Sequence, residues 1–326
     1  MASFSNRKAE SKVWIALKNQ LSKSERKFTI IDIGSRGGVE NHWKAFGSDL
    51  REIGFEPEKL ECDRLNKIKN IGHYRRHYPL AIYDKPDANL KLNLARHLPS
   101  SSVKTPNTKI LSRFHDLENL EIVRTVNVQA DTLDNILKQN SEDKVDFIKV
   151  DAEGSEYEIL KGAEDALGTT LGVQLEYSFL ELRKGTADFC KIFNFMAKHG
   201  FELFDLSTVR LGRKALYSTS GIKPAGQVVG GHVVFLKLPP LNGELNNNLV
   251  GDIVRFASIA EVLNLPDVAA EQLEYLNSVN WLSNKQFDEL KTSLRSQLPK
   301  KRLFQRFKDR VRTIPVLRSL IHKLRS

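Results

Sequence analysis

Two apolar segments of this chain each lead directly into a turn of acidic residues and glycine. The first segment holds Asp32 near its end and continues with Gly34 and Gly37. The second segment ends in Asp151, which Glu153 follows after one residue. Glycine allows a turn to approach a ligand closely, and open parallel sheets bind ligands at the carboxyl ends of their strands. We therefore predict that both turns face one binding site.

The glycine turn has the spacing of a cofactor loop. A dinucleotide loop reads Gly-x-Gly-x-x-Gly, and Arg36 occupies the place of its second glycine, which argues against a nicotinamide enzyme. The segment does match Asp-x-Gly-x-x-Gly, a pattern of enzymes that use S-adenosylmethionine. Asp32 would then hold the amino group of the methionine part, above a loop that contains Gly34 and Gly37. Glu56, at the end of the next predicted strand, would bind the ribose hydroxyls.

The acidic turn offers carboxylates that could accept a proton from a substrate. Asp151 is the first candidate for a general base, because an acid that ends an apolar central strand is destabilising unless it is used or paired. Glu153, Glu176 and His232 are the further catalytic candidates. Glu153 could instead stabilise the start of the next helix, and His232 could serve packing alone. Oxygen-rich groups of this kind could also hold a divalent metal ion, but their spacing is not diagnostic and we assign no ligands.

The elements that must position these residues alternate between β and α. The predicted strands span residues 28–33, 51–55, 76–83, 145–150, 171–176, 201–206 and 232–238. The predicted helices span residues 6–23, 39–46, 57–67, 155–167 and 186–199. Residues 84–125 break the pattern and are predicted to form an inserted hairpin and loop over the sheet edge. The order indicates the α/β fold class with a mostly parallel sheet.

The predicted domain organisation has three parts. An N-terminal helix occupies residues 1–27 and the α/β domain residues 28–240. The segment that follows, Pro239-Pro240 and then Asn242 to Asn248, has the composition of a linker. A helical extension over residues 250–326 is predicted to complete the chain.

Several stretches of the sequence together resemble the FkbM-type methyltransferases. They are Ile31–Gly38, Gly54–Glu58, Thr132–Asp134, Asp146–Glu156, Leu160–Ala163, Gly200–Asp205 and Gly226–Gln227 before a Val-Val-Phe-Leu strand. The resemblance covers about residues 28–238 and leaves out the C-terminal helical extension. It implies a Rossmann-like class I methyltransferase fold with a mostly parallel, seven-stranded sheet. It also implies transfer of a methyl group from S-adenosylmethionine to a hydroxyl, commonly on a sugar of a polysaccharide, glycolipid or natural product.

This resemblance assigns roles to individual residues. The predicted cofactor-binding residues are Asp32, Gly34, Arg36, Gly37, Glu56 and Asp151. The turn from Asp151 to Glu156 would face the substrate, a sugar or a glycoconjugate. Two other functions remain as alternatives: an RNA methyltransferase, and a catalytically silent protein that keeps the fold and binds glycans or membranes.

The basic charge of the chain is concentrated at its C-terminal end. Residues 300–326 contain ten Lys or Arg and one Asp, and so carry +9 of the formal net charge of +10. The rest of the chain is nearly neutral, which does not favour nucleic acid as a partner. The apolar residues of this tail recur every three or four positions, as in a basic amphipathic helix. The tail could pack on the body with a charged outer face, attach to an anionic membrane surface or bind nucleic acid.

The cellular setting follows from what the sequence does not contain. The first residues lack the apolar core of a signal peptide, and no apolar run approaches the roughly 18 residues of a membrane span. Cys62 and Cys190 show neither a metal-type spacing nor a disulfide framework, as expected in a reducing compartment. We predict a cytoplasmic protein that could attach peripherally to the inner membrane face. The oligomeric state does not follow from the sequence.

Overall fold

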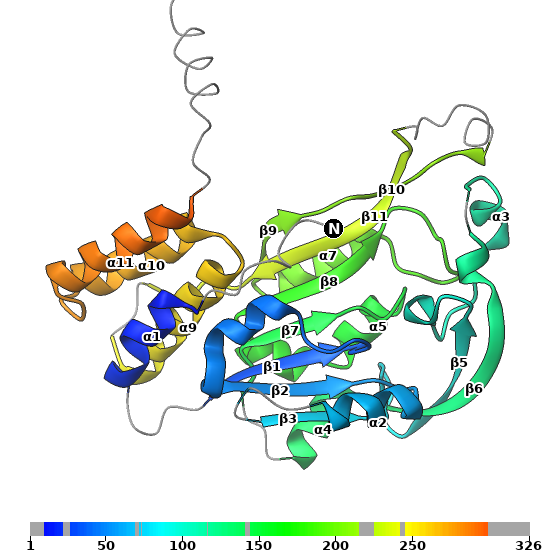
Figure 1. The fold of residues 1–326 in the computed structure, drawn as a ribbon, viewed down its shortest axis with the longest axis horizontal. Coiled ribbons are helices and arrows are strands. Elements are labelled where there is room, and N and C mark those ends of the chain that lie inside the picture. Colours follow the sequence, from blue (N-terminus) through cyan, green and yellow to red (C-terminus); the bar gives the residue numbers. More distant parts are fainter. Residues whose placement is uncertain are drawn as a thin grey trace, which may run out of the picture.

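The computed structural model describes residues 10–21, 27–68, 72, 74–115, 117–140, 144–214, 225–241 and 245–298. Its main sheet contains β1 (Phe28–Ile33), β2 (Leu50–Phe55), β3 (Tyr74–Tyr78), β7 (Phe147–Val150), β8 (Gly172–Ser178), β9 (Glu202–Leu206), β10 (Val209–Leu211) and β11 (Gln227–Leu236). The strand order is β10-β11-β8-β7-β1-β2-β3, and β9 also pairs with β11. Figure 1 shows this sheet at the centre of the molecule. The predicted α/β fold class is confirmed.

Most pairs in this sheet are parallel. β3, β2, β1, β7 and β8 run in one direction, and β11 is antiparallel to β8, β9 and β10. The sheet has eight strands rather than the predicted seven, because two short strands, β9 and β10, both pair with β11 at the outer edge. In the register of the central strands, Asp32 lies beside Gly54 on one side and Lys149 on the other.

Four helices cover one face of the sheet. They are α4 (Leu133–Gln139), α5 (Glu156–Lys161), α6 (Glu164–Thr169) and α7 (Phe189–Lys198). Residues of β1 that point to this face, such as Ile31 and Ile33, share an apolar cluster with α5 and α7. The predicted helix over 155–167 is interrupted at Gly162, where a Cβ atom would lie 2.1 Å from the carbonyl oxygen of Tyr83. Close contact with the neighbouring segment therefore breaks one predicted helix into two short ones.

The inserted segment forms a second, smaller sheet. It contains β4 (Ala81–Ile82), β5 (Ala88–Ala95) and β6 (Ile122–Asp131) in the order β4-β6-β5. β5 and β6 are antiparallel, as the predicted hairpin requires. Short helical turns η3 (Leu98–Ser100), α3 (Thr108–Leu111) and η4 (Glu118–Leu120) lie between them. Figure 1 shows this sheet beyond the carboxyl ends of β1, β2 and β7.

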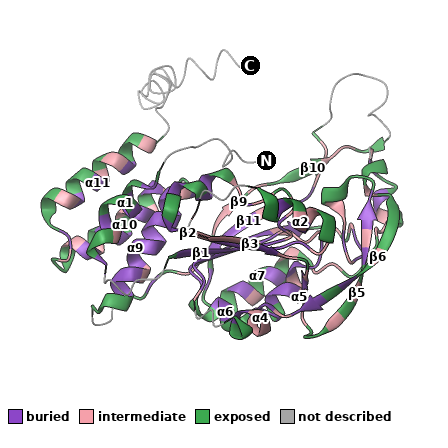
Figure 2. Cartoon of the chain, turned by 60° about the horizontal axis from the view of Figure 1, so that its bottom comes forward, coloured by how far each residue is buried: buried purple, intermediate pink, exposed green. Residues whose placement is uncertain are grey.

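The N-terminal helix and the C-terminal helices pack together at the opposite end of the main sheet, as Figure 2 shows. They are α1 (Lys12–Leu17), α9 (Asn247–Val262), α10 (Pro266–Ser278) and α11 (Asn284–Gln297). Glu261 of α9 accepts hydrogen bonds from Ser11 Oγ (2.7 Å) and Val13 N (3.0 Å). One apolar cluster includes Val13, Phe28 and Ile253, so both ends of the described chain share a core with β1.

Two predicted helices differ from the structure. The helix predicted over 6–23 is described over residues 10–21, where it consists of α1, capped by Ser11 through Trp14 N, and a 3-10 turn, η1 (Lys18–Gln20); its other residues lie outside the described ranges. The helix predicted over 39–46 is a 3-10 segment, η2 (Asn41–Asp49), in which Gly47 adopts a left-handed φ of 53°. The next helix, α2 (Lys59–Lys67), begins two residues later than predicted.

The basic tail over 300–326 lies outside the described residues, so its predicted amphipathic helix is not tested. Among the described helices, none combines the length and apolar character that a membrane crossing requires.

Candidate active site

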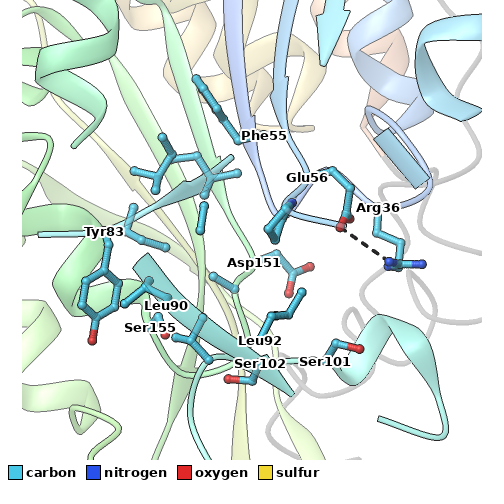
Figure 3. Close-up of a pocket in the computed structure, with 18 of the residues that line it drawn as sticks. Arg36, Phe55, Glu56, Tyr83, Leu90, Leu92, Ser101, Ser102, Asp151 and Ser155 are labelled. Atoms are coloured by element: carbon cyan, nitrogen blue, oxygen red, sulfur yellow. Dashed lines mark hydrogen bonds and ion pairs between the residues drawn. The ribbon is translucent and has the colours of Figure 1, made fainter. Parts of the chain in front are cut away.

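A cavity of about 650 Å³, including its open mouth, lies at the carboxyl ends of β1, β2 and β7 (Figure 3). The lining residues come from four regions: the glycine turn, the end of β2, the β4 segment with the inserted sheet, and the acidic turn. They include Gly34, Arg36, Phe55, Glu56, Leu80–Tyr83, Leu90, Leu92, Leu98, Ser101, Ser102, Asp151 and Ser155. The cavity thus combines apolar walls with a few polar groups.

Glu56 presents a carboxylate to this cavity. Its Oε1 accepts a hydrogen bond from Glu58 N (2.9 Å) and lies 3.5 Å from Arg36 Nη2 (Figure 3). Both of these contacts involve Oε1, which leaves Oε2 for a ligand hydroxyl. Burial raises the pKa of Glu56, and the nearby Arg36 guanidinium opposes that shift. Arg36 also pairs with Glu58, so its position is fixed by two carboxylates.

The glycine turn differs in detail from the expectation. Gly34 has a φ of 76°, and a Cβ atom there would lie 1.9 Å from the carbonyl oxygen of Asp151. The missing side chain therefore makes room for the backbone of the acidic turn, whereas the sequence suggested room for the ligand. Gly37 has a φ of 87° and faces open space. Its backbone N–H donates to Glu61 Oε1 at 3.1 Å.

Asp32 is fully buried and lies behind the cavity rather than on its wall. Lys149 Nζ lies 3.2 Å from Asp32 Oδ1 and 3.5 Å from Asp151 Oδ2. The second oxygen, Asp32 Oδ2, is buried and has no hydrogen-bond partner among the described residues. Burial raises the pKa of Asp32, and Lys149 lowers it in part. A buried carboxylate oxygen without a partner is a site where an added N–H donor would be favourable.

Lys149 was not predicted as a functional residue. Burial lowers its pKa, but the charges of Asp32, Asp151 and Glu40 outweigh that effect and hold the pKa above its usual value. The sequence carried one signal that could have identified it, because a lysine interrupts the apolar strand from Phe147 to Val150. A buried cation of this kind must be paired to be tolerated.

The acidic turn is held in a strained shape. Glu153 has a φ of 55°, a left-handed conformation that non-glycine residues adopt rarely and mostly where structure around them enforces it. Its Oε2 accepts from Arg183 Nη2 at 2.7 Å, and its carbonyl oxygen accepts from Ser102 Oγ at 2.8 Å. Arg183 Nη2 also donates to the carbonyl oxygen of Ser100 at 2.7 Å. Arg183 and Ser102, which sequence reasoning missed, thus tie the insertion to the turn.

The buried carboxylate of Glu156 holds the same turn through backbone hydrogen bonds. Its Oε1 accepts from Ala152 N (3.0 Å) and Gly154 N (3.1 Å). Burial raises its pKa to about 7. This side chain is therefore part of the framework that holds Asp151 and Glu153.

Glu176 and His232 lie side by side on neighbouring strands, since they are register partners in β8 and β11. Burial raises the pKa of Glu176 well above its usual value, and the carboxylates of Glu153, Glu156 and Asp151 raise it further. The structure thus brings three of the predicted catalytic acids into one electrostatic neighbourhood. No group of three or more metal-type side chains that could hold an ion occurs within the described residues.

The sequence matches the model of the methyltransferase FkbM domain over residues 33–203, which is about half of the chain. The chain belongs to the FkbM methyltransferase family. It is an S-adenosylmethionine-dependent methyltransferase, and the predicted resemblance is confirmed. No match to a curated protein was found.

Solved structures that are similar to this FkbM methyltransferase include other methyltransferases. Magnesium protoporphyrin IX methyltransferase from Synechocystis PCC 6803 with bound S-adenosylmethionine shares 8% identity over 70% of this chain and 77% of that one, with a TM-score of 0.32. A putative S-adenosylmethionine-dependent methyltransferase from Listeria monocytogenes shares 8% identity over 69% and 98%, with a TM-score of 0.36. The N-terminal domain of EvdMO1, in the presence of S-adenosylhomocysteine and D-fucose, shares 12% identity over 72% and 85%, with a TM-score of 0.32. Scores this low carry no functional argument, so the assignment rests on the family match and the site.

The side chains around the cavity fit S-adenosylmethionine. The second oxygen of Glu56, which lines the cavity, suits ribose hydroxyls. The partnerless Asp32 Oδ2 lies behind the wall, so it suits an ammonium group only through a bridging water. The apolar wall formed by Phe55, Leu80 and Ile82 suits a flat aromatic ring. When bound, the cofactor supplies an electrophilic methyl group on a sulfonium centre.

Proposed function

We propose that this FkbM methyltransferase methylates a hydroxyl group of a sugar or glycoconjugate. The observation that carries the proposal is the Asp151 carboxylate, which lines the cavity while Lys149 Nζ lies 3.5 Å from its Oδ2. A sugar hydroxyl is a poor nucleophile at neutral pH, so a nearby base must accept its proton as the new bond forms. The contact with Lys149 helps to orient this carboxylate for that task.

The surrounding residues support a hydroxyl-rich acceptor. Glu176 and Glu153 lie within electrostatic range of Asp151, and carboxyl groups bind hydroxyls well because they accept in two directions. Unlike Asp151, Glu153 does not line the cavity, and its Oε2 is bound to Arg183, so it is better suited to orient an acceptor than to be the base. Asp151 therefore remains the first candidate for proton removal, with Glu176 and His232 as secondary candidates.

A methyl-transfer assay with a panel of glycan acceptors tests this proposal. We expect transfer to at least one glycan by the unaltered enzyme. Asp151→Asn should lower kcat by about 10²–10⁴-fold, the usual contribution of a general base. Its affinity for S-adenosylhomocysteine should fall by less than the tenfold expected of Glu56→Ala, because Asp151 is only one of the predicted cofactor-binding residues and Glu56 remains. Asp267→Asn on α10 is the matched control and should change neither quantity.

The proposal is wrong if no glycan accepts a methyl group while a non-glycan hydroxyl or amine does. Full activity of Asp151→Asn would contradict the proposed role of Asp151 as the base but not the proposed glycan methylation. Involvement of a divalent metal is a separate alternative, which the described side chains do not support because they form no group that could hold the ion. Activity lost after chelation and restored by Mg²⁺ or Mn²⁺ would support it, and unchanged activity after chelation would refute it.

A further inference from the structure

Three segments distant in sequence meet beyond the acidic turn. They are residues 102–115 of the insertion, residues 179–188 after β8, and residues 209–214 at β10. Lys184 N donates to Thr105 O (2.9 Å), His115 N to Gly212 O (3.1 Å) and Lys214 N to Arg113 O (3.2 Å). Figure 1 shows α3, within the first segment, beside the outer ends of β10 and β11. Backbone hydrogen bonds thus join the three segments into one continuous wall.

This wall is strongly basic although the body of the chain is nearly neutral. It carries six exposed cations that we call the basic rim: Lys109, Arg113, Lys184, Arg210, Arg213 and Lys214. No described carboxylate forms an ion pair with any of these six. Two further cations of the wall, Lys104 and Arg183, are paired internally with Glu158 and Glu153.

The two described acids of the wall are engaged with other groups. Glu181 accepts from Asn107 Nδ2 (3.1 Å) and Gly185 N (2.7 Å). Asp188 caps α7 by accepting from Lys191 N (2.8 Å). Because these carboxylates hold loops in shape, the positive charge of the rim is not compensated by ion pairs with described residues.

Two arginines of the rim are held in place. Arg213 lies over the ring of Phe114, with its Cζ 4.7 Å from the ring centroid, and it hydrogen-bonds to Gln227. Arg210 Nη1 donates to Gly226 O at 3.0 Å. A guanidinium fixed in this way loses less side-chain entropy when it binds an anion.

The wall that carries the basic rim contacts the acidic turn through Arg183, the neighbour of Lys184. Pro106 and Arg183 are joined by an antiparallel bridge, and Arg183 Nη2 is 2.7 Å from Glu153 Oε2. Glu153 lies two residues from Asp151. An acceptor with its hydroxyl at Asp151 would therefore extend toward the rim if it is longer than one sugar.

We propose that the basic rim binds a phosphate or diphosphate group attached to the acceptor, so that the substrate is a phosphate-linked sugar. This inference rests on the proposed sugar methylation and names the chemical class of its acceptor. Arginine and lysine groups recognise phosphate oxygens through charge-assisted hydrogen bonds. RNA is disfavoured because the rest of the body is nearly neutral. Phe114 is buried under Arg213, but Phe179 of the same wall is exposed and could stack on a base, so the test below includes an RNA oligonucleotide.

Calorimetric titration with inorganic pyrophosphate tests the rim without any methyl transfer. The test variant is Arg113→Glu with Lys214→Glu, and the control is Lys285→Glu with Arg295→Glu on α11, which makes the same change in charge. We expect the test variant to bind pyrophosphate about tenfold or more weakly and the control within about twofold of the unaltered protein. Equal affinity for S-adenosylhomocysteine in all three proteins shows that each is folded. If the charge-reversed variant misfolds, Arg113→Gln with Lys214→Gln replaces it.

Two outcomes would overturn the inference. One is equal pyrophosphate binding by the test variant and the unaltered protein. The other is that the unaltered protein binds an RNA oligonucleotide more tightly than pyrophosphate and that the test variant loses this RNA binding. These results do not depend on turnover, so they are distinguishable from failure of the proposed sugar methylation.

A second measurement distinguishes the sources of the phosphate. Methyl transfer is compared for a nucleoside-diphosphate sugar in solution, a lipid-diphosphate-linked glycan in uncharged vesicles and the same glycan without phosphate. We expect KM to be lowest for one of the phosphate-linked forms, and to rise in the rim variant for that form only. A KM that is equal with and without phosphate would contradict the inference.

Discussion

The cofactor side and the acceptor side of this site are built in different ways. The cofactor side consists of the glycine turn, Glu56 and the apolar wall, and nearly all of it comes from the first 103 residues. The acceptor side consists of the acidic turn, Glu176 and the basic rim, which come from segments far apart in sequence. The contrast is between a cofactor side made by a few groups close together in sequence and an acceptor side assembled from distant segments.

Lys149 contacts both Asp32 and Asp151 and so joins the two sides. Of the changes considered, its replacement should have the largest effect on the free energy of unfolding. Lys149→Met leaves the buried Asp32 without its cation, and breaking a buried pair in this way costs about 3–5 kcal/mol in free energy of unfolding. The loss should shrink at low pH, because Asp32 has a raised pKa and becomes neutral there. Denaturant unfolding at two pH values measures both effects.

A matched lysine at the other end of the sheet provides the control. Lys18→Met removes the ion pair of Lys18 with Asp49 at 2.6 Å, which is partly exposed and should contribute about 1 kcal/mol or less. Lys149→Arg should recover part of the stability. Equal losses for Lys149→Met and Lys18→Met would show that Lys149 is not a central link.

The acidic turn should give the molecule a pH-dependent stability. The pKa of Glu156 is about 7 in the folded protein and lies near 4.5 when unfolded. Between these values the folded state binds more protons, so stability falls as pH rises. Glu156→Gln mimics the protonated form and keeps an oxygen that accepts from Ala152 N and Gly154 N.

We therefore expect the free energy of unfolding of Glu156→Gln to rise relative to that of the unaltered protein by about 1–3 kcal/mol as the pH is raised from 5 to 8. Denaturant unfolding at both values measures the change. Glu202→Gln, at an exposed position of β9, should show no such gain. A difference between Glu156→Gln and the unaltered protein that does not vary with pH would contradict the prediction.

The basic tail should affect neither side of the site. We predict that deleting residues 300–326 leaves the affinity for S-adenosylhomocysteine unchanged and reduces binding to anionic vesicles. Co-sedimentation with anionic and with uncharged vesicles measures this. If the full chain does not bind anionic vesicles, the predicted membrane attachment is wrong.

The parts that could be predicted from sequence are those governed by local patterns. β1 has the predicted bounds, because an unbroken apolar segment is typical of a central parallel strand. Thr132, a residue type that favours helix starts, caps α4 with its Oγ1 accepting from Asn135 N. Asp151 and Glu56 reach one cavity because the carboxyl ends of parallel strands share an edge.

The remaining features depend on contacts between distant segments. Arg183 and Glu153 are 30 residues apart, and nothing local to either predicts that they pair. The contact between Gly34 and the Asp151 carbonyl likewise appears only once β1 and β7 are neighbours. The basic rim could not be recognised from the net charge, because acidic residues elsewhere in the body cancel the positive charge of the rim in that sum.

The central claim is that the cavity at Glu56 binds S-adenosylmethionine, and calorimetric titration with S-adenosylhomocysteine tests it most directly. We predict that the unaltered protein binds one equivalent and that Glu56→Ala loses about tenfold or more in affinity, about 1.4 kcal/mol, while Glu118→Ala on the exposed η4 loses none. Equal affinity of the Glu56→Ala and unaltered proteins, or no binding by either, would contradict the account.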